Sequence, residues 1–230
     1  MAASASIEDE VEVIYYLRDN EPRMITAWKD AFKYVGNVFK ISAGDIFKDA
    51  PAADAIVSPA NSFGFMVEGI DRVYSRHFGW QLQEGPRHLM RHKHGGELPV
   101  GQAIIVRMFE PGVTDVSSLW WYGNPYFNKG QPIQYLISAP TMRIPMDVSN
   151  TVNAYLAFRA VIRAVKDHNS IQEDKIRSVL CPGLCTLNGQ MPYERSARQM
   201  REAWDIFGSG INEAPSSLSE ALQQHTRLTK

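Results

Sequence analysis

The chain has 230 residues, 44% of them hydrophobic, and a formal net charge of −1. This length is enough for one large domain with a substantial core. The balanced charge gives no global positive field that would attract nucleic acid, and no apolar run reaches the roughly 18 residues that a membrane-spanning helix needs. We therefore expect a soluble single domain over residues 11–207, with a disordered lead at 1–10 and a polar tail at 208–230.

The N-terminal sequence lacks the basic start and the apolar segment of a secretory signal. The only two cysteines are Cys181 and Cys185, which are too few for a disulfide framework. A metal or redox pair would need further ligands, so we interpret both as small loop residues. These features predict a reducing compartment, either cytoplasm or nucleus.

Apolar patterns predict an alternation of strands and helices. If the first two strands pair in parallel through a helical crossover, the sheet gains an extra strand at its N-terminal end. We expect Ser149 or Asn150 to cap the long helix. The expected strands are 11–17, 38–42, 55–58, 104–108, 134–139 and 178–182. The expected helices are 24–34, 72–83, one resuming after Gly85-Pro86, 150–166, 193–207 and a last one within 217–226.

Residues 56–71 run from an apolar strand through a loop with two glycines to the start of a helix. Pro59 ends the strand because it has no N–H group for the next ladder hydrogen bond. Small residues let backbone amides approach an anion, and a helix N-terminus favours negative charge. This stretch therefore predicts a phosphate-binding loop.

The Pro-Ala-Asn sequence at 59–61, with Asp71 ten residues after the Asn, resembles the first ligand loop of the macrodomain family. The family motif is Asn-Pro-Ala-Asn followed by a glycine-rich run that ends in Gly-Val-Asp before a helix. This chain has Ser58 in place of the first Asn. It also has a bulky sequence at 65–68 where the family has consecutive glycines, and only Gly69 remains of that run.

Gly44-Asp45-Ile46 follows the second expected strand and resembles the Gly-Asp-Ile motif of the same family. The resemblance implies that Asp45 accepts a hydrogen bond from the adenine amine and that the Ile46 N–H group reaches a ring nitrogen. The alternative is that Asp45 is a turn residue that only caps a helix.

Residues 182–192 resemble the second macrodomain loop, whose backbone amides wrap a diphosphate. Pro182 and Pro192 keep the family interval, but Leu187 stands where the family has a glycine. We expect Asn188 and Gly189 to supply the positive φ angles that turn amides inward.

The resemblance covers about residues 38–207. It implies a three-layer α/β/α macrodomain fold with a central mixed sheet, here extended by an N-terminal strand. It also implies a site that binds ADP-ribose without a cofactor or metal. The implied ligand-binding residues are Asp45, Ile46, Ala60, Asn61, Gly69, Ile70, Asp71, Cys185, Thr186, Leu187, Asn188, Gly189 and Gln190.

The hypothesis for function is hydrolysis of ADP-ribose from a mono-ADP-ribosylated protein, with ubiquitin as one candidate acceptor. By the resemblance, Asp71 orients or deprotonates a water and Asn61 fixes the distal ribose, while Glu68 is a rival carboxylate. Two alternatives remain open. One is a reader that binds ADP-ribose without turnover and uses Asp71 only as a helix N-cap, and the other is an ADP-ribose 1″-phosphate phosphatase. The sequence predicts no membrane partner and no nucleic-acid partner.

Two further features are less informative. His88 and His92 are four residues apart, as two metal ligands on one helix face would be, but the adjacent Arg and Lys charges favour a solvated face. The aromatic segment 119–127 is interpreted as a hydrophobic anchor or as a loop over the site.

Overall fold

The computed structural model describes residues 11–109 and 128–230. The expectations for the lead at 1–10 and for the aromatic segment 119–127 therefore fall outside the described residues. Within the described ranges, no helix is both long and apolar enough to span a bilayer.

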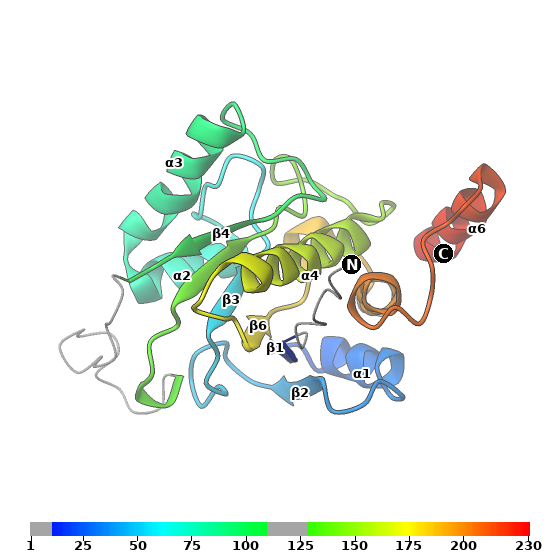
Figure 1. Cartoon of the computed structure of the whole chain (residues 1–230), viewed down its shortest axis with the longest axis horizontal. Coiled ribbons are helices and arrows are strands. Elements are labelled where there is room, and N and C mark those ends of the chain that lie inside the picture. Colours follow the sequence, from blue (N-terminus) through cyan, green and yellow to red (C-terminus); the bar gives the residue numbers. More distant parts are fainter. Residues whose placement is uncertain (1–10, 110–127) are drawn as a thin grey trace, which may run out of the picture.

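A six-stranded mixed sheet forms the centre of the molecule, with strand order β2-β1-β6-β3-β5-β4 (Figure 1). All neighbouring strands are parallel except β4, which runs antiparallel to β5 at one edge. The strands are β1 (Ile14–Asp19), β2 (Phe39–Ala43), β3 (Ala55–Ser58), β4 (Ile104–Arg107), β5 (Tyr135–Ser138) and β6 (Ser178–Cys181). The predicted N-terminal strand is thus confirmed, and it pairs with β2 and with β6.

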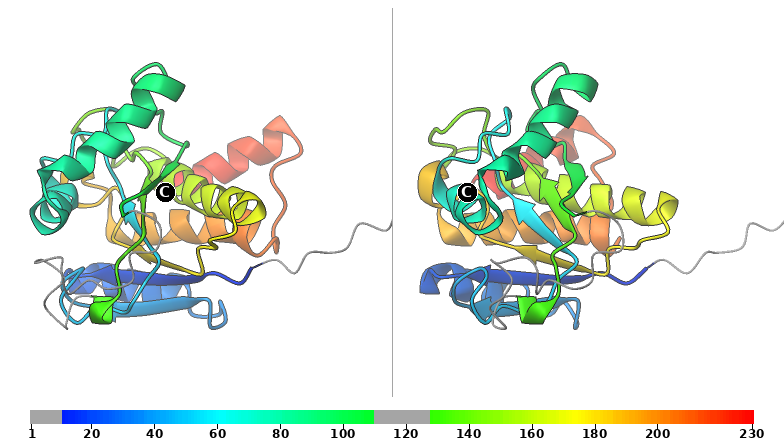
Figure 2. Two further views of the ribbon diagram at one scale, coloured as in Figure 1. Left: turned by 60° about the vertical axis from the view of Figure 1, so that its left-hand side comes forward. Right: turned by 90° about the vertical axis from the view of Figure 1, so that its left-hand side faces the viewer.

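Helices cover both faces of the sheet, which gives the three-layer α/β/α arrangement that the sequence predicted (Figure 1, Figure 2). The helices are α1 (Pro22–Ala31), α2 (Gly69–Phe78), α3 (Glu84–Lys93), α4 (Asn153–Ile171), α5 (Tyr193–Ala203) and α6 (Leu218–Thr229). Alternate side chains of the central strands enter different cores, because successive residues of a strand point to opposite faces. For example, Val57 packs in the core with α1, α4 and α5, whereas Ile56 packs with α2.

Several helix boundaries differ from the predicted ones. Helix α2 begins at Gly69 rather than after Asp71, and it ends before Gly79, whose φ of 97° breaks the helix. Residues Trp80–Gln83 form a separate 3₁₀ turn, and α3 begins directly after it. The expected break at Gly85-Pro86 is wrong, because a proline in the first turn of a helix removes no hydrogen bond.

The long helix α4 begins at Asn153, so neither Ser149 nor Asn150 caps it. The carboxamide of Gln199 replaces a cap, since its Oε1 accepts hydrogen bonds from the N–H groups of Ala154 and Tyr155 at 3.1 and 3.2 Å. This contact between α5 and α4 satisfies donors that a helix start otherwise leaves without partners.

The segment expected as a polar tail contains α6, which Ser217 caps by accepting a hydrogen bond from the Glu220 N–H group. Leu228 near its end is buried in the larger core. Most of α6 nevertheless lies away from the layers that cover the sheet (Figure 1).

Candidate functional site

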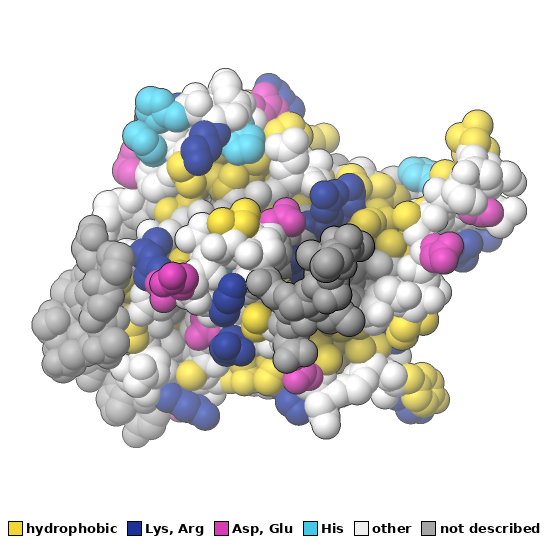
Figure 3. All heavy atoms as spheres, in the orientation of Figure 1, with side chains coloured by type: hydrophobic (Ala, Val, Ile, Leu, Met, Phe, Trp, Pro, Cys, Tyr) yellow, Lys and Arg dark blue, Asp and Glu magenta, His cyan; other side chains and the backbone are white. Residues whose placement is uncertain are grey.

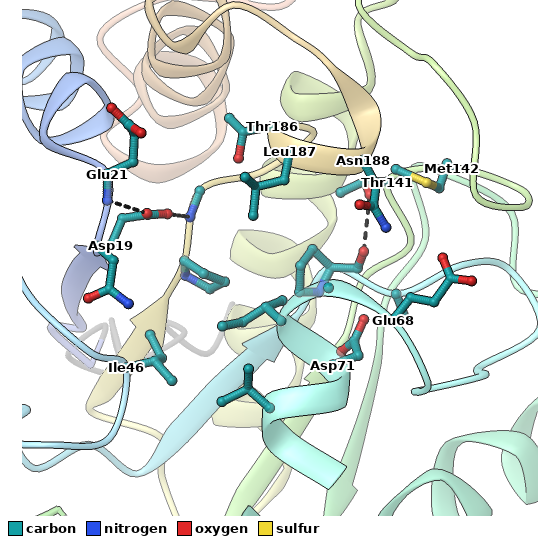
Figure 4. A pocket seen from close by; sticks show the side chains of 18 of the residues that line it. Asp19, Glu21, Ile46, Glu68, Asp71, Thr141, Met142, Thr186, Leu187 and Asn188 are labelled. Carbon is teal, nitrogen blue, oxygen red and sulfur yellow. Dashed lines mark hydrogen bonds between the residues drawn. The ribbon is translucent and has the colours of Figure 1, made fainter. Parts of the chain in front are cut away.

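A cavity of about 510 Å³ opens at the end of the sheet that is formed by the carboxyl ends of the parallel strands. Open α/β sheets bind ligands at the carboxyl ends of their strands, where backbone groups and helix starts converge. Five segments line this cavity, and Figure 4 shows most of their side chains. The segments lie within residues 18–21, 44–46, 59–73, 141–145 and 182–188.

Most of the predicted site residues lie together around this cavity. Those that line it are Ile46, Ala60, Asn61, Glu68, Gly69, Ile70, Asp71, Thr186, Leu187 and Asn188. Four others stand outside the lining. They are Asp45, Cys185, Gly189 and Gln190.

Asp71 is the most perturbed acidic group of the cavity. Its side chain belongs to the first turn of α2, is 7% exposed, and accepts a hydrogen bond at 2.5 Å from Ser58 Oγ to its Oδ1. Burial raises the pKa of Asp71 from 3.8 to about 7, and the hydrogen bond from Ser58 opposes part of that rise. A carboxyl group with such a pKa is half ionised near neutral pH, as a general base requires.

The helix start beside Asp71 is arranged for an anion. Residues Gly69, Ile70 and Asp71 all line the cavity, and their N–H groups belong to the first turn of α2, where no carbonyl of the same helix can accept from them. The N-cap residue is Glu68, whose side chain makes no capping bond. Asp71 is therefore not the N-cap, which is the role that the reader alternative gives it.

The first loop is shaped by side-chain contacts as well as by Gly64 and Gly69, which have φ angles of 71° and 53°. Met66 is 1% exposed, its carbonyl accepts a hydrogen bond from Ser75 Oγ at 2.7 Å, and its N–H group donates to Gln83 Oε1 at 3.3 Å. Asn61 also holds the loop, because its Nδ2 donates to the carbonyl of Phe65 and its Oδ1 accepts from two backbone N–H groups. The carboxamide of Asn61 is thus engaged in the loop while its residue lines the cavity.

Asp45 shows the geometry of a turn cap, since its Oδ1 accepts hydrogen bonds from the N–H groups of Phe47 and Lys48, both at 2.9 Å. The neighbouring backbone is held by Arg18 of β1, whose guanidinium donates to the carbonyls of Asp45 and Lys48. Gly44 has a φ of 137°, and a Cβ atom there would lie 2.5 Å from Arg18 Nη2. Glycine is therefore required next to Asp45.

We expect Asp45→Ala to lower the free energy of unfolding by about 1 kcal/mol, the usual value of a side-chain cap. Urea denaturation measures this loss, with Asp30→Ala as a control at an exposed Asp of α1. Equal stability of Asp45→Ala and the parent would contradict the capping role.

The second loop is built differently from the expectation. Positive φ angles occur at Cys185 (62°), Leu187 (41°) and Gln190 (54°), and not at Asn188 or Gly189. The prediction for Asn188 and Gly189 is therefore wrong. A side chain with positive φ is strained by contact between its Cβ and the backbone, so three such residues so close together need support from elsewhere in the fold. Part of that support is a hydrogen bond from the Met191 N–H group to the Cys185 carbonyl.

Asp19 is a site residue that the sequence analysis missed. It ends β1, and its carboxylate accepts hydrogen bonds from Glu21 N–H at 2.9 Å and from Gly183 N–H at 3.1 Å (Figure 4). It therefore ties the end of β1 to the second loop. Thr141 was also missed, and its hydroxyl donates to the carbonyl of Pro59 at 3.0 Å. The turn sequence at 19–22 was a signal for Asp19, but nothing in the sequence indicated its partner.

The histidine and cysteine pairs do not add ligands to the site. His88 and His92 lie on α3, with ring centroids 4.3 Å apart, and histidines gather over that helix (Figure 3). Neither of the two lines the cavity. Cys181 and Cys185 are buried, and burial raises the pKa of both thiols. Within residues 11–109 and 128–230, no three His, Cys, Asp or Glu side chains converge as a metal site would require.

Comparisons with known proteins identify the fold. No family model matches the sequence, and no curated protein sequence matches it significantly. Among solved structures, the macrodomain of Mycobacterium tuberculosis DarG matches with a TM-score of 0.52 and 19% identity, over 71% of this chain and 88% of that one. The Oceanobacillus iheyensis macrodomain with MES bound matches with a TM-score of 0.50 and 16% identity, over 80% of this chain and 87% of that one.

The protein therefore has the macrodomain fold, in agreement with the resemblance of its loops. At these identities the likeness concerns the fold, and the activity has to be argued from the site itself.

Proposed function

We propose that this protein binds ADP-ribose in the cavity and hydrolyses it from mono-ADP-ribosylated proteins. The observation that carries the proposal is the buried carboxyl group of Asp71, which lines the cavity beside a helix N-terminus and has a pKa raised to about 7. Perturbed carboxyl groups in a cleft are typical of general acids and bases. Ubiquitin is one acceptor protein to test.

In the proposed complex, ADP-ribose lies along the cavity. The adenine occupies the end at Asp19 and Ile46, near Asp45, and the distal ribose occupies the end at Asn61 and Asp71. The two ends are separate in Figure 4. The diphosphate lies between them, where the first turn of α2 and the second loop offer backbone N–H groups. A Cβ atom on Gly69 would lie 3.8 Å from Asn188 Nδ2, so the first and second loops approach each other closely here.

The proposed reaction uses Asp71 as the base. The Ser58 hydroxyl donates a hydrogen bond to Asp71 Oδ1. No donor among the described residues is seen to reach Asp71 Oδ2, which leaves that oxygen for a water in the cavity. The water oxygen attacks the anomeric carbon, and the bond from this carbon to the acceptor breaks. For an ester-linked acceptor the leaving group is a carboxylate, and Asp71 takes the proton from the water.

The reader alternative has less support from this geometry. A reader would need Asp71 only as a helix cap, but Glu68 occupies that position and Asp71 is buried against Ser58. Burial of a carboxyl group without a cation is unfavourable, and such a cost is characteristic of functional sites. No particular contact favours the phosphatase alternative.

We expect ADP-ribose to stabilise the protein. A ligand that binds only the folded state raises the free energy of unfolding by about 2.7 kcal/mol at a hundredfold excess over its dissociation constant. Thermal denaturation with increasing ADP-ribose measures the effect, and ribose 5-phosphate at the same concentrations is the control. No shift at millimolar ADP-ribose would contradict the assignment of the cavity.

Product analysis then distinguishes the three activities. The parent protein is incubated with ester-linked, arginine-linked and ubiquitin-linked ADP-ribose, and separately with ADP-ribose 1″-phosphate. Free ADP-ribose from a modified protein supports the proposal, and inorganic phosphate alone supports a phosphatase. Binding without either product would make this protein a reader.

A further inference from the structure

Six exposed apolar side chains gather around the mouth of the cavity, and we call them the apolar rim. They are Phe65, Val67, Val73, Ile144, Met146 and Leu187. Phe65, Val73 and Leu187 line the cavity themselves. Val67 precedes the lining residue Glu68, and Ile144 and Met146 flank the lining residue Pro145.

Contacts between loops bring these side chains together. The Ser62 N–H group donates a shared hydrogen bond to the carbonyls of Met142 and Arg143, both at 3.1 Å. The first loop therefore adjoins the segment at 141–146. The Val148 N–H group donates to the carbonyl of Gly189 at 2.9 Å, which joins that segment to the second loop. The rim is therefore made by three adjoining loops together with Val73 of α2.

The stability of the fold does not explain why these positions are apolar. Leu187 is 70% exposed and has a φ of 41°, so it is strained and gains little burial. Phe65 and Val67 flank the buried Met66, which directs both of its neighbours outward. Ile144 and Met146 are about half exposed at 49% and 50%. Contiguous exposed apolar surface of this kind is typical of interaction sites.

The charges around the rim favour a protein over a nucleic acid as the partner. The guanidinium of Arg87 lies over the Phe65 ring at 4.6 Å, and that of Arg143 lies over Phe63 at 5.0 Å while it pairs with Glu97. Arginine and aromatic residues are enriched in protein interfaces. The carboxylates of Glu68 and Asp147 stand in or beside the rim, where they would repel a phosphodiester backbone.

The position of the rim also matches where an acceptor would lie. Asp19 and Ile46 lie on one side of the view in Figure 4, whereas Asp71 and Glu68, which follows the rim residue Val67, lie on the other. If the bond that is cleaved lies beside Asp71, the acceptor protein attached to it must extend out of the cavity past Glu68 and the adjoining rim. We propose that the apolar rim binds an apolar surface patch of the folded acceptor protein, so that intact modified proteins are the preferred substrates of this site. This inference rests on the proposed function.

The test compares binding of three ligands in the Asp71→Asn background, which keeps the substrates intact. They are mono-ADP-ribosylated ubiquitin, a short peptide with the same linkage, and free ADP-ribose. The rim variant is Ile144→Thr with Met146→Gln, because neither side chain lines the cavity. The matched control is Ile171→Thr, since Ile171 is an exposed Ile at the end of α4, near the start of β6 and outside the cavity lining.

We expect the modified protein to bind at least about tenfold more tightly than the peptide, an effect that one or two buried apolar contacts can supply. The rim variant should lose this advantage and keep its affinity for the peptide and for free ADP-ribose. The Ile171→Thr control should retain all three affinities. Titration calorimetry gives these values whether or not the parent protein turns over any substrate.

Three outcomes would overturn the inference. One is equal affinity for the modified protein and the peptide, and another is an equal loss for all three ligands in the rim variant. The third is a dimer of the parent that the rim variant abolishes in sedimentation, which would assign the rim to a second copy of the chain. Failure of free ADP-ribose to bind would instead contradict the proposed function, so the two failures are distinguishable.

Discussion

Asp71→Asn should slow the release of ADP-ribose from a modified protein by about a hundredfold or more, the usual contribution of a general base. The asparagine has nearly the same shape and can still accept the hydrogen bond from Ser58, but it cannot take a proton from water. Affinity for ADP-ribose should stay within about tenfold of the parent, since the lost interaction acts mainly in the transition state. Single-turnover kinetics and calorimetry measure the two quantities separately.

Glu68→Gln is the matched control for this experiment. Glu68 also lines the cavity, but it is exposed and no neighbouring donor is seen to fix its carboxylate. We expect it to retain most of the turnover. A large loss in Glu68→Gln with full activity in Asp71→Asn would transfer the role of base to Glu68.

Asp71→Asn should also change how the free energy of unfolding depends on pH. The pKa of Asp71 is about 7 in the folded state and 3.8 in the unfolded state, so between these values the folded protein binds more protons than the unfolded chain. Stability of the parent therefore falls as pH rises through this window. The loss from this one group is about 4 kcal/mol, at roughly 1.4 kcal/mol for each pKa unit.

Asparagine does not titrate, so the free energy of unfolding of Asp71→Asn should not fall for this reason as pH rises. We expect its free energy of unfolding relative to the parent to rise by about 4 kcal/mol between pH 4 and pH 8. Urea denaturation at these two values measures the difference, and Asp45→Asn serves as a control at a more exposed carboxylate. A constant difference between variant and parent at all pH values would show that the pKa of Asp71 is not raised.

Much of the fold could be predicted because its strands have strong local signals. The runs at 55–58 and 178–182 are short, apolar and ended by proline, and both are central strands in the structure. The N-terminal strand could also be predicted, since it is rich in Val, Ile and Tyr residues and precedes a helix that starts at a proline. Helix starts were harder to predict. For α4, the cap comes from Gln199, which is more than 40 residues away in the sequence.

The position of the site could be predicted from its motifs, but its internal construction could not. The sequence shows that the first loop lacks the consecutive glycines of the family, yet it does not show that Met66 and Ser75 hold the loop in place of them. Likewise, propensity assigns positive φ to Asn and Gly, whereas the fold imposes it on Leu187. The contact between Asp19 and Gly183 joins residues 164 positions apart, so no local pattern could indicate it.

The pH dependence of ADP-ribose release tests the role of Asp71 most directly. The value of kcat/KM should rise with pH and reach a plateau above a bend near pH 7, where Asp71 becomes ionised. Ser58→Ala should move this bend to higher pH, because the Ser58 hydroxyl lowers the pKa of Asp71. A profile that stays flat from pH 5 to pH 9, or a bend that Ser58→Ala leaves in place, would contradict the account.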